Sequence, residues 1–181
     1  MTRLTAAERR TQLLDATKAL VDSDGFHAVS IEAVARAAGI TRPIVYHHFP
    51  DGLDELLVAL VERETARAQE QLLGLVGGER DLVATFEAYL EAVEGDPATW
   101  RLVLMPPEGT PRVLHDRIRE ARRAFAAAIA GAGGIGSPDP EVTGVSLQAL
   151  ADEGARALLD GRFERERLVA HARWLIGALR A

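Results

Sequence analysis

Apolar residues recur every three or four positions along most of the chain, which is the spacing of an amphipathic α-helix. No stretch alternates between apolar and polar residues for long enough to predict a β-strand. Glycine and proline interrupt the pattern, for example at Gly25, the expected left-handed stop of the first helix. We therefore predict an all-α fold. Nine helices are expected, over about residues 5–22, 30–39, 41–49, 53–73, 81–94, 97–105, 111–130, 139–160 and 164–179.

Two of the expected helices are short and are joined by the sequence AGIT. Ser30 is placed to cap the N-terminus of the first, and Gly39 closes it. Thr41 caps the second, whose Pro43 is tolerated because it lies in the first turn. Neither helix is long enough to fold alone, but the preceding helix over residues 5–22 supplies the missing apolar face.

The second short helix has an inner and an outer side. Val45 and Phe49 are four residues apart and join Ile40 on the inner side, so we expect them in the core. The outer side carries hydroxyl, guanidinium and imidazole groups, which can donate hydrogen bonds to phosphates and base edges. Three packed helices of this length match a helix-turn-helix DNA-binding domain in size. The outward residues are Thr41, Arg42, Pro43, Tyr46 and His47.

Net charge does not decide whether the chain binds nucleic acid. The 181 residues carry a formal net charge of −6 and the pI is about 5.4, whereas nucleic-acid binders usually present a basic patch. Residues 1–50 hold six Lys or Arg against five Asp or Glu, and the rest of the chain holds 15 against 22. The acidic excess therefore belongs to the later part of the chain.

Several other classes of protein are excluded or disfavoured. The absence of cysteine excludes disulfides, thiolate catalysis and sulfur-ligated metals. His47 and His48 are adjacent, and neighbouring helical residues point about 100° apart, so no metal site is expected there. Without a catalytic or phosphate-loop motif we expect neither an enzyme nor a cofactor. Without a signal-peptide core or a run of about 20 apolar residues, we expect a cytoplasmic protein with no membrane partner.

The stretch SIEAVARAAGITRPIVYHHFPDGLDELL resembles the signature of the TetR family of transcriptional regulators. In that signature a capped helix ends in Ala-Gly, and a helix begun by Ser or Thr then ends in Leu/Val-Tyr-x-(His/Tyr)-Phe. The resemblance covers about residues 8–60 and implies that the helix over residues 41–48 lies in the major groove of double-stranded DNA. Arg42 and Thr41 would then reach bases or phosphates, and Tyr46 and His47 would bind phosphate. The candidate DNA contacts are Ser30, Thr41, Arg42, Pro43, Tyr46, His47 and His48.

One position departs from this signature. The family usually places a lysine or arginine at the start of the next helix, where this chain has Leu53 between Asp51 and Asp54. We expect weaker non-specific DNA affinity and a shallower salt dependence than in a relative that carries the cation, because each neutralised phosphate adds to that dependence.

The chain is expected to divide into a DNA-binding domain over residues 1–52 and a helical bundle over residues 53–181. The resemblance implies that the last two helices pair with their copies in a homodimer, and a two-fold dimer would also space two recognition helices for a pseudo-palindromic site. Large side chains in the middle helices suit an ordinary core and a small-molecule pocket equally well, and the resemblance favours a pocket among the fifth, sixth and seventh helices. The candidate pocket residues are Phe86, Tyr89, Trp100, Met105, His115 and Phe125.

The expected function is that of a ligand-responsive regulator, a repressor that a small-molecule effector releases from its operator by tilting the helix over residues 53–73. The alternative is a helical ligand-binding or interaction dimer that has lost DNA recognition. The acidic total charge favours the alternative, and the intact sequence GITRPIVYHHF opposes it.

Overall fold

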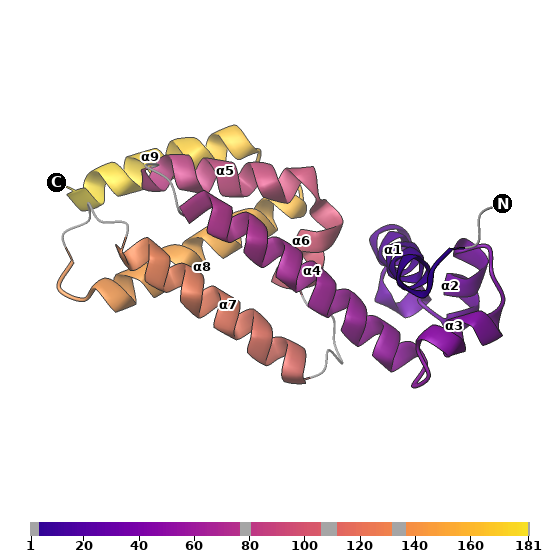
Figure 1. The fold of residues 1–181 in the computed structure, drawn as a ribbon. Helices are drawn as coiled ribbons and strands as arrows, with labels where there is room; N and C mark the ends of the chain where they lie inside the picture. Colours follow the sequence, from indigo (N-terminus) through magenta and orange to yellow (C-terminus); the bar gives the residue numbers. More distant parts are fainter. Residues whose placement is uncertain (1–3, 77–80, 106–111, 132–136, 181) are drawn as a thin grey trace.

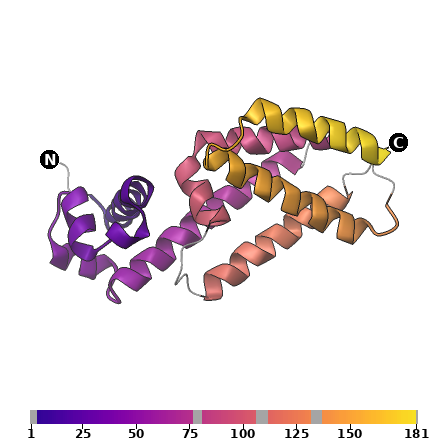
Figure 2. The same ribbon diagram turned by 180° about the vertical axis from the view of Figure 1, so that it is seen from behind.

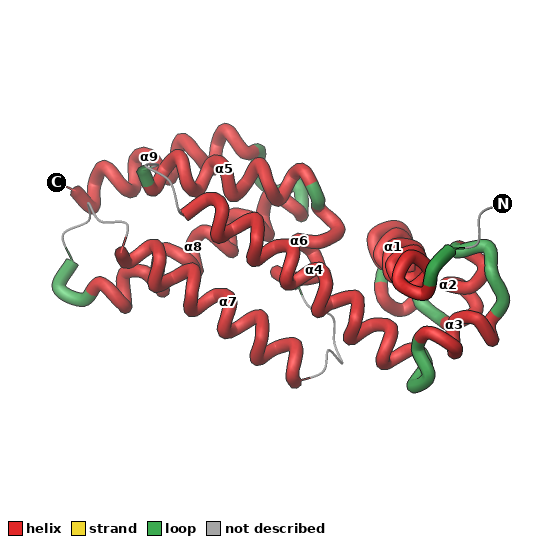
Figure 3. The backbone as a smooth tube through the Cα atoms, viewed as in Figure 1, coloured by secondary structure: helices red, strands yellow, loops and turns green. Residues whose placement is uncertain are grey.

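The computed structural model describes residues 4–76, 81–105, 112–131 and 137–180. Within these ranges the chain forms nine α-helices and one 3₁₀ turn, with no β-strand (Figure 1, Figure 3). The all-α prediction is therefore confirmed. The helices are α1 (Ala6–Asp24), α2 (Ile31–Ala37), α3 (Arg42–His48), α4 (Leu53–Val76), α5 (Leu82–Gly95), α6 (Pro97–Leu104), α7 (Arg112–Gly131), α8 (Pro140–Leu159) and α9 (Arg165–Arg180), and the 3₁₀ turn is η1 (Phe26–Ala28).

The caps that the sequence suggested set the ends of the short helices. The Ser30 hydroxyl accepts a hydrogen bond from the Ala33 amide at 3.1 Å, which satisfies one free N–H at the start of α2. Gly39 ends this segment with a φ of +67°, a conformation that favours glycine. Thr41 occupies the N-cap position of α3 as expected, but its side chain makes no capping hydrogen bond.

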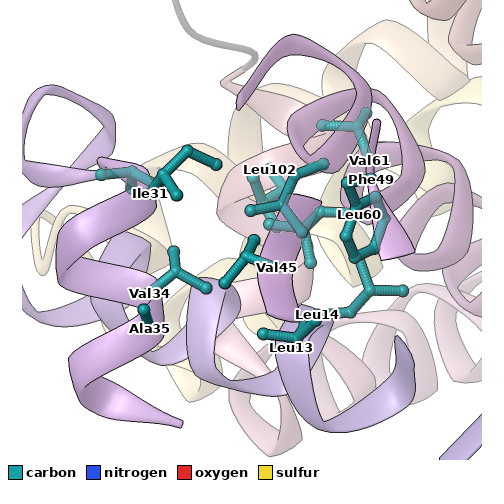
Figure 4. Packing of buried hydrophobic residues seen from close by; sticks show 12 residues of the cluster. Leu13, Leu14, Ile31, Val34, Ala35, Val45, Phe49, Leu60, Val61 and Leu102 are labelled. Carbon is teal, nitrogen blue, oxygen red and sulfur yellow. The ribbon is translucent and has the colours of Figure 1, made fainter. Parts of the chain in front are cut away.

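The first three helices pack around one apolar core together with the first half of α4 (Figure 4). Leu13 of α1, Val34 of α2 and Val45 of α3 are fully buried and meet Leu60 of α4 there. Phe49, just after α3, is also fully buried, so the inner side assigned to this helix is confirmed. Because α4 enters this core, a domain division at residue 52 remains a proposal.

The remaining helices form a bundle around the second half of α4, and the molecule is elongated with α1–α3 at one end (Figure 1). Seen from behind, α8 and α9 lie on the side of the bundle that faces away from α4 (Figure 2). Helices α7 and α8 approach each other closely at Gly144 of α8, where a Cβ atom would overlap the backbone carbonyl oxygen of Ala126 in α7. Glycine here permits close packing of the two helices.

One helix runs further than expected. The helix that begins at Leu53 was expected to end at about residue 73, but α4 passes Gly74 and continues to Val76. A single glycine weakens a helix by only about 0.5–1 kcal/mol relative to alanine, which the neighbouring turns can offset. None of the helices in the ranges above is long and apolar enough to cross a membrane.

Two glycine substitutions test this packing. Gly144→Ala should lower the free energy of unfolding by about 1–3 kcal/mol, because the added methyl group forces α7 and α8 apart. Gly74→Ala is the matched control, since no heavy atom lies within 4 Å of its added Cβ, and it should raise stability by about 0.5–1 kcal/mol. Urea unfolding of both variants measures the difference, and a stabilised Gly144→Ala variant would contradict the packing argument.

Candidate nucleic-acid interface

The outer side of α3 is exposed as the sequence predicted. Thr41, Arg42, Pro43 and Tyr46 are exposed, and so is His47. His48 is half-buried at the end of the helix, and Ser30 is half-buried at the start of α2. The structure thus gathers six of the seven candidates on or beside α3, with Ser30 one helix away.

Arg42 is held by an acidic neighbour. Its Nη1 atom lies 2.7 Å from Oε1 of Glu32 on α2, and both side chains are about half exposed. An ion pair this exposed contributes at most about 1 kcal/mol. Arg42 can therefore exchange Glu32 for a guanine edge or a phosphate at little cost.

Tyr46 is positioned by the turn that follows α3. Gly52 has a φ of +79°, which favours glycine, and a Cβ atom there would lie 3.4 Å from Cε1 of Tyr46. The tyrosine ring therefore lies against the turn, with 43% of the residue exposed. The tyrosine ring is thus held against the turn while part of the residue remains accessible to a partner.

The end of α3 is tied to α1 by cations. Arg10 donates a hydrogen bond from Nη1 to the His48 carbonyl oxygen at 2.7 Å, and its guanidinium lies 4.1 Å from the centre of the Phe49 ring. Burial lowers the pKa of His48, and the positive charges of His47, Arg9 and Arg10 lower it further. The Arg9 and Arg10 cations of α1 therefore lie near this end of α3.

Leu53 stands where the family places its cation, and its side chain has a packing role. It is half-buried against the core of α1–α3. The acidic start of α4 is used locally as well, since Glu55 accepts a hydrogen bond from the Asp51 amide at 3.1 Å and lies 3.7 Å from Arg10.

Ile44 is an outward residue that the sorting of α3 by sequence did not single out. It is 38% exposed on α3, between Pro43 and the buried Val45. An exposed aliphatic group on this helix can contact the methyl group of thymine. A residue without hydrogen-bonding groups is easily overlooked as a DNA contact. The helical period nevertheless indicated its exposure, because the adjacent Val45 points inward.

A family model described as bacterial regulatory proteins of the tetR family matches residues 13–60, the span from α1 to the middle of α4. Residues 13–60 thus belong to the TetR family. The chain is a transcriptional regulator and not an enzyme, as the sequence indicated.

Regulators with both directions of control are similar to this TetR-family chain. The transcriptional activator FasR of Mycolicibacterium smegmatis is 27% identical over 166 residues, which is 87% of this chain and 75% of that protein. A transcriptional repressor of Mycobacterium tuberculosis is 34% identical over 80 residues, which is 43% of this chain and 42% of that protein. A TetR-family regulator from Streptomyces coelicolor has a similar structure, with a TM-score of 0.77 and 26% identity over 97% of this chain and 82% of that one.

The bundle contains a cavity of about 160 Å³ between α5, α7, α8 and α9. Phe86, Tyr89 and Phe125 line it. Trp100 lines a smaller cavity of about 30 Å³ between α4, α5, α6, α7 and α8, which Tyr89 and Phe125 also border. Met105 packs half-buried against the bundle core, and His115 is exposed on α7. The pocket was expected among the fifth, sixth and seventh helices. All three helices line the smaller cavity, whereas the larger one takes its lining from α8 and α9 in place of α6.

The DNA-binding helices are joined to the bundle by buried ionic contacts. Lys18 of α1 places its Nζ atom 3.0 Å from Glu64 of α4, 2.8 Å from Asp96 at the start of α6 and 2.6 Å from the Thr99 hydroxyl. The Thr99 hydroxyl also donates to the fully buried Glu64 carboxylate, on whose other side Arg63 lies. These contacts fix α1 against α4 and α6.

The carboxylates of this network are held in the ionised form. Burial acts to raise the pKa of Glu64, but hydrogen bonds from Thr99 and Lys18 and the charges of Arg63 and Lys18 bring it below its ordinary value. The pKa of Asp96 is lowered in the same way, with burial opposed by hydrogen bonds from Lys18 and Thr99 and by the charge of Lys18.

Lys18→Met tests the network. Removal of the cation leaves the buried Glu64 less well compensated, so we expect the free energy of unfolding at pH 7 to fall by about 3 kcal/mol. Because the folded pKa values of Glu64 and Asp96 are lowered, their contribution to stability is present above the ordinary carboxyl pKa and disappears as pH falls through the folded values. The deficit of the variant should therefore shrink as urea unfolding is repeated from neutral pH down to about pH 3.

Arg67→Met is the matched control for this experiment. Arg67 approaches the same Asp96 at 3.7 Å but is more than half exposed, so its removal should change stability by no more than about 0.5 kcal/mol. Equal deficits in the two variants, or a Lys18→Met deficit that does not depend on pH, would contradict the role given to the buried network.

Proposed function

We propose that this TetR-family regulator is a ligand-responsive repressor that binds a pseudo-palindromic operator as a homodimer and is released by a small molecule. The observation that carries the proposal is the exposed outer side of α3, where Arg42, Tyr46 and His47 are accessible, with Arg10 of α1 bonded to the end of the helix. Such a regulator would act on DNA in the cytoplasm. FasR is named as an activator and the mycobacterial protein as a repressor, so a reporter gene under the selected operator would test the direction of control.

The side chains of α3 suit the major groove. Arg42 can form two hydrogen bonds to a guanine edge, while Tyr46 and His47 can donate to phosphates. Pro43 and Thr41 would approach the DNA at the start of the helix, with His48 at its end and Ser30 on the flanking backbone. These contacts combine base reading with the phosphate contacts that set the register on the duplex.

Unpaired apolar side chains on α8 and α9 support the dimer. Trp174 is 65% exposed and Val142 is 59% exposed, and monomeric proteins rarely expose a large apolar patch. Gly177 has open space where a Cβ atom would stand, which leaves room for a second helix. A two-fold axis through this face would present two α3 helices about 34–36 Å apart, one turn of DNA. The exposed apolar residues of this face are Val142, Val145, Leu150, Trp174 and Leu179.

The cavity between α5, α7, α8 and α9 supports a small-molecule effector. A ligand that binds one arrangement of α4 more tightly than another shifts the population toward it, and operator affinity falls by the ratio of the two ligand affinities. The candidates Phe86, Tyr89 and Phe125 line this cavity, so they are proposed ligand contacts. Trp100 and Met105 do not line this cavity and would support its wall from the bundle core. His115 is exposed and does not line it either.

Operator binding is tested by selecting bound duplexes from a random pool and measuring affinity by fluorescence anisotropy. Arg42→Ala and Tyr46→Ala should each weaken binding to the selected operator by about 5- to 150-fold, the equivalent of about 1–3 kcal/mol for the DNA contact that each substitution removes. Dimerisation should be unchanged in sedimentation. Arg119→Ala is the control, because Arg119 is an exposed arginine on α7, outside the α1–α3 helices. Failure to enrich any duplex, with a stable dimer in hand, would favour the ligand-binding dimer that has lost DNA recognition.

The dimer face is tested by Val145→Glu combined with Trp174→Glu. Two charges on each copy make the apolar contact unfavourable, so the variant should sediment as a monomer at micromolar concentration. Operator affinity should fall with it, because the two half-sites are no longer bound together. Ala66→Glu on the exposed side of α4 should leave both properties unchanged. A dimer that survives the double substitution would show that another surface joins the copies.

A further inference from the structure

The cavity between α5, α7, α8 and α9 has an uncharged lining. Among the described residues around it there is no Lys, Arg, Asp or Glu, and only Thr85, Tyr89 and His171 carry polar side-chain atoms. The rest of the wall is aliphatic or aromatic. The chemistry of this wall limits the class of molecule that it can hold.

The hydroxyl of Tyr89 is already engaged on the far side of the wall. It donates to Oδ1 of Asp152 at 3.3 Å, and burial together with the charge of Asp152 raises its pKa well above the ordinary value. Tyr89 therefore stays neutral and offers mainly its ring to the cavity. An occupant meets an apolar surface at this depth.

Behind that wall lies an ion pair. Asp152 and Arg122 line the smaller cavity, where Arg122 Nε lies 3.2 Å from Oδ2 of Asp152. Gln148 donates to the same carboxylate oxygen at 2.6 Å. An ion in the larger cavity would therefore lack a countercharge within contact distance, and burying an unpaired charge is strongly unfavourable.

Polar contact is confined to the rim. His171 on α9 is exposed and stacks on Trp174 with the ring centres 5.4 Å apart, so it stands where the cavity opens toward the α8–α9 face. Thr85 on α5 is the other polar residue that could meet a ligand. Such a site can satisfy one hydroxyl or carbonyl group while the rest of the molecule is apolar.

The size of the cavity limits the size of the apolar part of a ligand. Its volume is about 160 Å³. Apolar cavities of about 150 Å³ in other proteins accept benzene. Gly154 contributes to the space, because a Cβ atom there would lie 3.1 Å from Cζ of Phe86 and would push that ring.

We propose that the effector is an uncharged, compact apolar molecule with a body of about one six-membered ring and at most one hydroxyl or carbonyl group. Carboxylates, phosphate esters and ammonium ions are excluded from the site by the lack of a partner charge. This assignment of ligand class rests on the ligand response proposed above.

A series of probes with one ring in common tests the class. Toluene and benzyl alcohol are neutral, whereas benzoate and benzylammonium carry opposite charges on the same ring. With the full-length dimer at pH 8, the neutral probes should raise the melting temperature as their concentration rises, because they bind only the folded state. In calorimetry benzyl alcohol should bind at least tenfold more tightly than benzoate or benzylammonium.

Substitutions that fill the cavity locate the binding. Ala172→Leu adds volume to the wall from α9, and Ala151→Leu does so from α8 if the first variant folds poorly. Either should weaken binding of benzyl alcohol at least tenfold, while Ala66→Leu on the exposed side of α4 should not change it. The proposal is wrong if a charged probe binds more tightly than both neutral ones, if neither neutral probe binds the folded dimer, or if binding appears only after the α8–α9 face is disrupted, since a partner side chain would then be the occupant.

Operator affinity measured on the same samples separates this proposal from the one on which it rests. Binding of a neutral probe without any change in operator affinity would uphold the ligand class and overturn ligand-controlled release. Release of the operator by a charged molecule, with no binding of the neutral probes, would uphold ligand control and overturn the class.

Discussion

The position of α3 relative to the bundle depends on one half-buried cation. Lys18 lies among the Glu64 and Asp96 carboxylates and the Thr99 hydroxyl, and it thereby fixes α1 against α4 and α6. Helix α3 takes its place from α1, through the shared apolar core and the hydrogen bond from Arg10 to the end of α3. Partners of a buried ion pair are costly to separate because each is left uncompensated, so these helices are expected to move together or through a discrete rearrangement.

Helix α6 connects the network around Lys18 to the larger cavity. Tyr89 forms part of the cavity wall, and its ring meets Trp100 edge to face with centres 5.1 Å apart. Trp100 directly follows Thr99, whose hydroxyl binds both Lys18 and Glu64. The cavity wall is therefore linked to α1 through α6, by ring packing between Tyr89 and Trp100 and by the backbone between Trp100 and Thr99. Contact alone carries no regulation, since any coupling must come from a difference in ligand affinity between two arrangements of these helices.

The sequence was sufficient for the helices and insufficient for the contacts between them. Ser30 and Val45 could be placed because capping and helical period are local properties. Burial of Glu64 could not be foreseen, because its partners come from α1 and α6 and a glutamate in a long amphipathic helix ordinarily faces water. The larger cavity could not be located from the sequence for the same reason: residues of α9 such as Leu175 line a space inside the bundle, and that space depends on how α9 packs on α5.

Leu53 shows how the acidic character of the chain can coexist with DNA recognition. Its half-buried side chain stabilises the junction of α3 and α4, so the position contributes packing where relatives contribute a phosphate contact. The remaining positive charge lies with Arg9 and Arg10 on α1. Each phosphate that no cation neutralises makes the fall of log affinity with log salt less steep by about 0.9. It also weakens binding to every sequence alike. Base contacts from Arg42 and Ile44 would be unaffected, so an interface with few cations would give up total affinity while keeping its preference for the operator over other DNA.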